Sequence, residues 1–213
     1  MALTDSPSPP ARRGRPGYDR DQVLSVAVRV FNQRGYDATS ISDLAGELGV
    51  TKSAVYHHFE SKSAILAVAL DDALGALESA LDEAVTRNTQ ASDQLRSIVR
   101  GAVEVLIAKL PSVTLLLRVR GNSDVETAAL ARRRAFDQRV TTIVRDAQTE
   151  GLVRGDIDAA VATRLVFGMI NSLVEWYRPD GTVDPDELAE DVLRVTLDGL
   201  QAAPPSEGAA VTT

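Results

Sequence analysis

Cysteine is absent from this 213-residue sequence, and histidine occurs only twice. Without cysteine the chain forms no disulfide and offers no thiolate to a metal, which suits a reducing compartment. The N-terminal stretch lacks the apolar segment of a secretory signal, and no apolar run is long enough to span a bilayer. We therefore expect a cytoplasmic protein without a membrane segment, cofactor or metal.

Aromatic residues are also scarce, at 4% of the chain, and the net charge of −7 leaves no general excess of cations. The charge is unevenly distributed, however. Residues 1–62 carry eight basic and seven acidic side chains, whereas the remainder carries 15 basic and 23 acidic ones. Because local clustering of cations decides whether a phosphate backbone can be approached, the N-terminal part remains a candidate for binding nucleic acid.

Apolar residues recur at helical spacing through most of the chain, and the alternation typical of strands is missing. Glycine and proline mark the expected boundaries, among them Gly35, Gly49, Pro111, Gly121 and Gly151. The sequence predicts an all-α fold. Helices are expected at about 19–34, 40–48, 52–59, 62–85, 91–109, 112–120, 124–150, 156–177 and 185–200.

The third expected helix has two distinct sides. At about 100° per residue, Val55 and Phe59 share one side and can pack inward. The opposite side and its flank then present polar or small side chains, namely Ser53, Ala54, Tyr56, His57 and His58. With the turn at Gly49, this arrangement is typical of a helix-turn-helix whose second helix enters a major groove.

A metal or catalytic role for the two histidines is the competing interpretation. His57 and His58 are adjacent, so they point about 100° apart on a helix and cannot bind one ion together. Ser53 and His57 have the spacing of a nucleophile and a base, but no oxyanion motif accompanies them. Contact with DNA accounts better for the set as a whole.

The segment FNQRGYDATSISDLAGELGVTKSAVYHHFESKSAIL resembles the N-terminal domain of the TetR family of bacterial transcriptional regulators. The resemblance covers residues 23–66 and implies a three-helix DNA-binding domain over 19–62. It also implies a helical ligand-binding and dimerisation domain over 63–201, between a disordered basic leader at 1–18 and a disordered tail at 202–213.

The same resemblance implies roles for individual residues. Thr39 and Lys62 would contact phosphate, Lys62 at the start of a long helix whose dipole favours an anion. Lys52 is the best candidate for a guanine edge. The other residues implied at base edges or phosphates are Thr51, Ser53, Ala54, Tyr56, His57 and His58.

The leader contains the short motif RGRP, with Arg13 and Arg15. It is similar to the AT-hook, in which arginines enter a narrow minor groove. A solvated basic leader that attracts DNA without reading it explains the same residues equally well. Both interpretations predict that residues 1–17 strengthen operator binding.

The expected helix at 156–177 is apolar almost all round and must be buried on more than one side. In the TetR family this helix and the last one, here 185–200, form a four-helix dimer interface, and thorough burial within one chain is the alternative. The family also implies a small-molecule pocket. Its expected lining is Val103, Leu106, Leu116, Arg120, Phe136, Val140, Phe167, Asn171 and Trp176.

The resulting hypothesis is a homodimeric, ligand-responsive regulator, most simply a repressor, that leaves its palindromic operator when a small molecule binds. The ending Trp176-Tyr177-Arg178-Pro179 resembles regulators that respond to acyl-CoA-like lipids. The long helix from Lys62 is expected to couple the pocket to the DNA-binding domain. Two alternatives remain: a helical small-molecule-binding or hydrolytic protein, and a constitutive DNA-binding protein without an effector.

Overall fold

The structure is a computed structural model that describes residues 18–200, and the described chain is built from helices. The predicted all-α class is confirmed. The helices are α1 (Arg20–Arg34), α2 (Ile41–Leu48), α3 (Lys52–His58), α4 (Lys62–Arg87), α5 (Ala91–Ala108), α6 (Leu110–Arg118), α7 (Asp124–Thr149), α8 (Ala159–Trp176) and α9 (Pro185–Leu200). Apart from Tyr18, the predicted leader and tail lie outside the described residues.

Short polar side chains start most of these helices by accepting a hydrogen bond from a backbone N–H of the first turn. Asp19 and Ser40 form complete capping boxes with Gln22 and Asp43. The remaining caps of this kind are Thr51, Ser61, Ser123, Asp158 and Asp184. These residues fix the first turn of each helix and therefore the direction in which it leaves its loop.

Two predicted boundaries were wrong by a few residues. Pro111 was expected to precede a helix, yet it lies in the first turn of α6, where its missing N–H leaves no hydrogen bond unmade. The helix expected from 156 begins at Ala159, because the carboxylate of Asp158 accepts from the backbone N–H groups of Ala160 and Val161.

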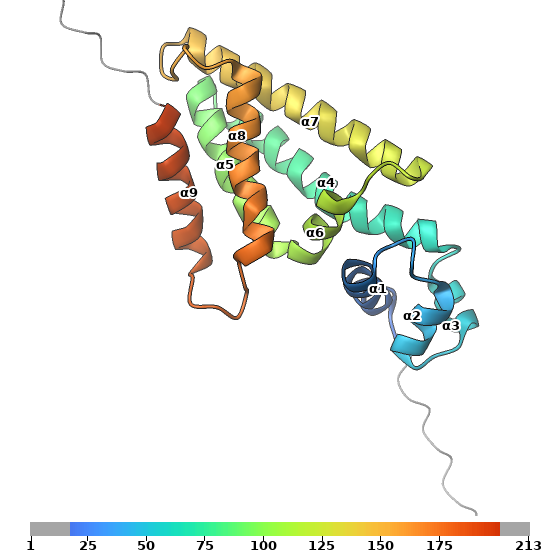
Figure 1. The fold of residues 1–213 in the computed structure, drawn as a ribbon. Coiled ribbons are helices and arrows are strands. Elements are labelled where there is room, and N and C mark those ends of the chain that lie inside the picture. Colours follow the sequence, from blue (N-terminus) through green and yellow to red (C-terminus); the bar gives the residue numbers. More distant parts are fainter. Residues whose placement is uncertain (1–17, 201–213) are drawn as a thin grey trace, which may run out of the picture.

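Helices α1–α3 gather at one end of the molecule and form a small three-helix unit, hereafter the head (Figure 1). Helix α4 runs from the head into the remainder, hereafter the body, where it packs against α5, α6 and α7. Helix α9 lies on α5 at the far end. The buried apolar side chains of head and body form one continuous core, with Val30, Val55 and Ile65 fully buried at the junction.

One side of α8 remains uncovered, so the alternative of thorough burial within one chain does not hold for this helix. Leu165 is 64% exposed and Trp176 is 51% exposed, while Val166 and Ile170 pack inward. Val195 of α9 is also 64% exposed. A single chain thus leaves large apolar side chains of its last two helices open to solvent.

None of the described helices is long and apolar enough to cross a membrane.

Candidate functional site

Helix α3 shows the predicted division into a buried and an exposed side. Val55 and Phe59 are buried, whereas Tyr56 is 51% exposed. Its other outward residues are Lys52, Ser53 and His57, with Ala54 and His58 half-buried at the edges. The rings of the two histidines contact edge to face, with centroids 5.2 Å apart. This seven-residue helix therefore holds two apolar anchors and offers hydroxyl, ammonium and imidazole groups outward.

The turn between α2 and α3 has the geometry of a helix-turn-helix. Gly49 adopts φ +66°, and the N–H of Val50 donates to the carbonyl of Ala45. Only glycine takes this left-handed conformation without steric cost, so the turn fixes the angle between the helices. The hydroxyl of Thr51 then accepts from the N–H of Ala54 at 3.3 Å and starts α3.

Several cations of the head are already engaged within the protein. Glu47 of α2 accepts from both Arg29 and Arg34 of α1, at 3.0 and 3.2 Å. The guanidinium of Arg20 lies 4.7 Å from the centre of the Phe59 ring. Lys52 is different, because its ammonium has no ion pair or hydrogen bond with any residue between 18 and 200.

Thr39, predicted to contact phosphate, is instead built into the fold. It is only 2% exposed, and its hydroxyl donates to the carbonyl of Gly35 at 2.8 Å. The side chain therefore closes the loop between α1 and α2 from inside. The sequence motif shows that position 39 carries a hydroxyl, but it does not show that this hydroxyl donates to a carbonyl four residues earlier.

Lys62 is also tied to the protein. Its ammonium donates to the carbonyls of Tyr36 and Thr39, both at 2.9 Å, and lies 4.2 Å from the centre of the Tyr36 ring. Carbonyl and cation–π contacts of this kind hold the start of α4 against the α1–α2 loop. In the protein alone, Lys62 therefore stabilises the contact between α4 and the α1–α2 loop, and its phosphate contact stays a prediction. Arg13 and Arg15 lie outside the described residues.

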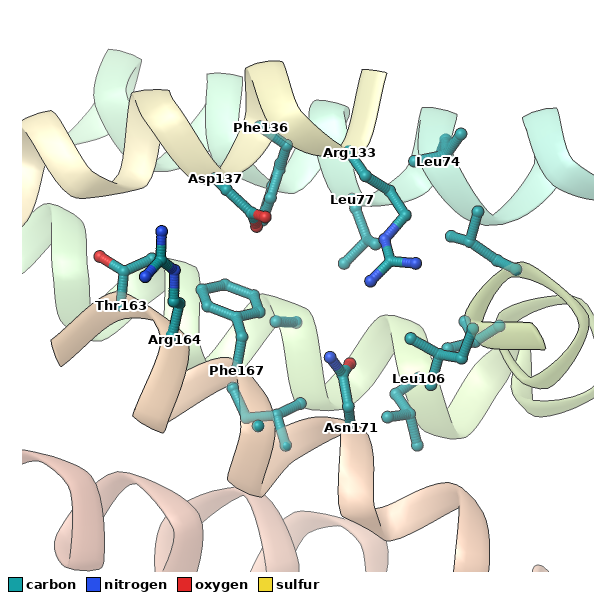
Figure 2. A pocket seen from close by; sticks show the side chains of 16 residues that line it. Leu74, Leu77, Leu106, Arg133, Phe136, Asp137, Thr163, Arg164, Phe167 and Asn171 are labelled. Atoms are coloured by element: carbon teal, nitrogen blue, oxygen red, sulfur yellow. The ribbon is translucent and has the colours of Figure 1, made fainter. Parts of the chain in front are cut away.

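The body contains a cavity of about 220 Å³ between α4, α5, α6, α7 and α8 (Figure 2). Its walls are mostly apolar, and the rings of Phe136 and Phe167 meet edge to face with centroids 5.4 Å apart. The lining consists of Leu74, Leu77, Ala102, Leu106, Val113, Leu116, Leu117, Arg133, Phe136, Asp137, Thr163, Arg164, Phe167, Gly168, Ile170 and Asn171. Such a space suits an apolar molecule with a few polar groups.

The polar groups of the cavity come from α7 and α8. Figure 2 shows Arg133 of α7 and Asn171 of α8 pointing into the space from opposite sides. Desolvation raises the pKa of the Asp137 carboxyl, against the opposing effect of Arg133 and Arg164. Neither guanidinium forms an ion pair with any described carboxylate. These groups are therefore available to a ligand.

Five of the predicted pocket residues line this cavity, namely Leu106, Leu116, Phe136, Phe167 and Asn171. Val103 and Val140 are buried in the core beside it. Arg120 lies instead beside the α1–α2 loop, and Trp176 stands exposed at the end of α8. Neither lines this cavity, because sequence position on a helix does not reveal which neighbour the side chain meets.

The residues that sequence reasoning missed include the charged ones, Arg133, Asp137 and Arg164. Their spacing carried a signal. Arg133, Phe136 and Asp137 lie at i, i+3 and i+4 on α7, the spacing of one helix face. Arg164, Phe167 and Asn171 lie at i, i+3 and i+7 on α8, which also places them on one face. A charged residue sharing a face with a phenylalanine on each of two neighbouring helices indicates a partly polar interior space.

Comparison with known proteins gives matches over most of the chain. Residues 23–69 match the family described as bacterial regulatory proteins, tetR family, and residues 88–200 match the tetracyclin repressor-like C-terminal domain. The HTH-type transcriptional repressor KstR2 of Mycolicibacterium smegmatis is 26% identical over 199 residues, covering 92% of this chain and 94% of that protein.

Solved structures resemble the fold as well. SCO3833, a member of the TetR transcriptional regulator family from Streptomyces coelicolor, superposes with a TM-score of 0.79 at 50% identity, covering 84% of this chain and 90% of that one. AibR in complex with isovaleryl coenzyme A and operator DNA gives a TM-score of 0.71 at 21% identity, covering 84% and 97%. At that identity, the similarity to AibR concerns the fold.

Proposed function

The chain belongs to the TetR family of bacterial transcriptional regulators, and from that premise we propose that it is a ligand-responsive repressor that binds a palindromic operator as a homodimer. The observation that carries this proposal is the outward side of α3, a polar surface held by Val55 and Phe59 beneath it. We assign DNA contact to seven residues there: Thr51, Lys52, Ser53, Ala54, Tyr56, His57 and His58.

The proposed roles follow from the chemistry of each group. The hydroxyl of Tyr56 and the imidazoles suit phosphate oxygens, which position the protein without reading sequence. Lys52 is a free cation at the first turn of α3 and suits a guanine edge or a nearby phosphate. Because Ser53 and Ala54 are small, they let the helix approach the bases closely.

One short helix is too small for specific binding, so the proposal requires two copies. The open apolar side of α8, with Leu165 and Trp176, and the exposed Val195 of α9 supply a surface for a second copy. Pairing there would bury these side chains and present two heads about 34–36 Å apart, one turn of DNA. The division into residues 19–62 for DNA and 63–201 for ligand and dimer forms part of this proposal.

We assign the effector to the cavity between α4 and α8. The apolar walls, Phe136 and Phe167 among them, suit an acyl chain or a comparable apolar group. Isovaleryl coenzyme A in the AibR complex is an example of such a ligand in a protein of the same fold. An effector shifts the heads away from operator spacing only if it prefers one arrangement of the helices over the other.

Two helices connect this cavity to the head. Helix α4 contributes Leu74 and Leu77 to the lining and begins at Lys62. Helix α6 contributes Val113, Leu116 and Leu117, and it packs against α1. We therefore extend the coupling role expected of α4 to α6, because displacement of either helix by a ligand would move the head.

Selection of bound sequences from random DNA tests the proposal. The full-length protein should enrich a palindrome, and the Lys52→Ala variant should bind that palindrome more weakly without loss of helix content. Enrichment of a palindrome that no apolar acyl compound releases would favour a constitutive DNA-binding protein. Failure to enrich any sequence would contradict the proposal of a repressor and would favour a helical small-molecule-binding protein. We further propose that the protein acts in the cytoplasm and catalyses no reaction.

A further inference from the structure

Most cations of the described chain are engaged with other groups of the protein. Arg100, Arg132, Arg139, Arg154 and Arg194, for example, all form ion pairs with carboxylates. Within residues 18–200, the arginine and lysine side chains without an ion pair, hydrogen bond or ring contact are Lys52, Arg96, Arg120, Arg133, Arg134, Arg145 and Arg164. Arg133 and Arg164 influence the Asp137 carboxyl, but neither forms an ion pair with it. In so acidic a body, arginines that form no ion pair call for an explanation.

Four of these free guanidiniums lie together, at α7 and α8. Arg134, Arg145 and Arg164 line a surface groove between the two helices, and Arg133 lines the cavity beside it. Arg134 and Arg145 are eleven residues apart, which places them about 16 Å from one another along α7 at about 1.5 Å per residue. They share one face, because eleven residues correspond to about three turns.

The groove is shaped by small and polar side chains. The hydroxyls of Thr141 and Thr163 meet across its floor at 3.2 Å and join α7 to α8. Ala160 lines the α8 side, and its small side chain leaves room for a ligand group to approach the guanidiniums. Asp137 is the one carboxylate that lines it. The groove therefore combines three cations with a single anion.

The groove also continues into the cavity. Asp137, Thr163 and Arg164 line both spaces. A molecule with its apolar part between Phe136 and Phe167 can thus extend a polar part past Arg164 into the groove. The two spaces differ in chemistry, one mostly apolar and the other cationic, which is the pattern expected for an amphipathic anion.

We propose that the groove between α7 and α8 binds the phosphate-bearing head group of an effector whose apolar part occupies the cavity. This inference rests on the proposed effector site and names the chemical class of its ligand. Guanidinium groups bind phosphate through paired N–H donors, and the spacing of Arg134 and Arg145 requires a long head group with more than one phosphate. The ligand is therefore an amphipathic molecule that joins an apolar group to a head with more than one phosphate. An acyl coenzyme A serves as the probe of this class, and the corresponding free acid binds less tightly.

Titration calorimetry on the full-length protein tests the groove with three probes: coenzyme A, decanoic acid and decanoyl coenzyme A. We expect coenzyme A alone to bind the unmodified protein and decanoyl coenzyme A to bind more tightly than decanoic acid. The double variant Arg134→Gln/Arg145→Gln should lose about tenfold in affinity for both coenzyme A compounds, as expected for charge-assisted contacts weakened by solvent. Its affinity for decanoic acid should stay unchanged.

The matched control is Arg96→Gln/Arg120→Gln, which removes two equally free cations outside the groove and should leave all affinities unchanged. The inference is overturned if coenzyme A does not bind the unmodified protein. It is also overturned if the groove variant loses as much affinity for decanoic acid as for the coenzyme A compounds, or if the control variant loses as much affinity for coenzyme A as the groove variant does. Operator release is measured separately. Groove-dependent binding without release would contradict the effector function alone, whereas release by decanoic acid without coenzyme A binding would contradict the groove alone.

Discussion

The side-chain amide of Asn32, near the end of α1, donates to the backbone carbonyl of Pro111 at the start of α6, at 2.8 Å. Arg118, the last residue of α6, donates in return to the backbone carbonyl of Asn32 at 2.7 Å. Both ends of α6 are thus attached to one residue of the head. Because the middle of α6 lines the cavity, these two hydrogen bonds connect a ligand-contacting helix to a DNA-facing unit.

The first prediction concerns this connection. Asn32→Ala removes the bond to Pro111, so movement of α6 is transmitted less completely to α1. We expect operator binding without effector to persist, while the ratio of operator affinities without and with effector falls toward one. Fluorescence anisotropy with labelled operator measures both. Asn88→Ala removes comparable amide bonds between α4 and α5 and should leave the ratio unchanged; an equal fall there would refute the special role of Asn32.

The second prediction separates two lysines that look alike in the sequence. Lys52→Met removes an exposed, unpaired cation, so operator affinity should fall and the slope of log affinity against log salt should decrease by about one. Its thermal stability should not change. Lys62→Met removes two carbonyl contacts and a cation–π contact, and should lower the unfolding free energy by about 1–3 kcal/mol. Equal stability of the two variants would show that the contacts of Lys62 with the α1–α2 loop do not stabilise the fold.

A third prediction uses Glu126, a buried carboxylate whose Oε2 accepts from the backbone N–H groups of Arg120, Gly121 and Asn122. Burial favours its neutral form, but these three hydrogen bonds outweigh burial and lower the pKa. A lowered pKa in the folded state contributes stability at neutral pH that is lost as the pH falls below the usual range of glutamate.

Glu126→Gln should therefore destabilise the protein by about 1–2 kcal/mol at pH 7 and much less in acid. Denaturant unfolding at several pH values measures the difference. The exposed Glu104 offers a control, since Glu104→Gln should leave the pH dependence intact. A Glu126→Gln variant whose destabilisation is the same at every pH would contradict the assignment.

The fourth prediction addresses the open side of α8. Leu165→Glu places a charge where a second copy is proposed to bury an apolar side chain, so the dimer should dissociate and operator affinity should fall with it. Sedimentation velocity measures the oligomeric state. Val85→Glu changes a comparably apolar, exposed residue at the end of α4 and should remain dimeric. Dissociation of both variants would indicate general destabilisation and not an interface at α8.

The sequence predicted the helices well because their signals are local. Caps such as Ser40 and the glycine at position 49 lie within a few residues of what they control. The hydrogen bonds of Thr39 and Lys62 could not be predicted from local sequence. Each side chain donates to backbone carbonyls whose position depends on the folded α1–α2 loop. The family resemblance identified both residues, but these contacts within the protein could not be read from it.

Only some of the residues that line the cavity could be predicted from the sequence, again because local patterns do not show three-dimensional neighbours. Phe136 and Phe167 were found because apolar residues on amphipathic helices point inward. Leu74 and Leu77 were overlooked as ordinary core residues of α4, since a stripe does not show where packing is incomplete. Charged residues such as Arg133 are normally solvated, and only the three-dimensional neighbourhood distinguishes an inward guanidinium from an outward one.

The pairing of Glu47 with Arg29 and Arg34 has a consequence for the conditions under which the regulator works. One carboxylate offsets only one of the two positive charges, so this cluster attracts DNA at long range less strongly than two unpaired arginines would. Contacts made by hydroxyl, imidazole and shape lose little strength as ionic strength rises. Operator binding should therefore weaken less with rising salt than it would if both arginines of this cluster were unpaired.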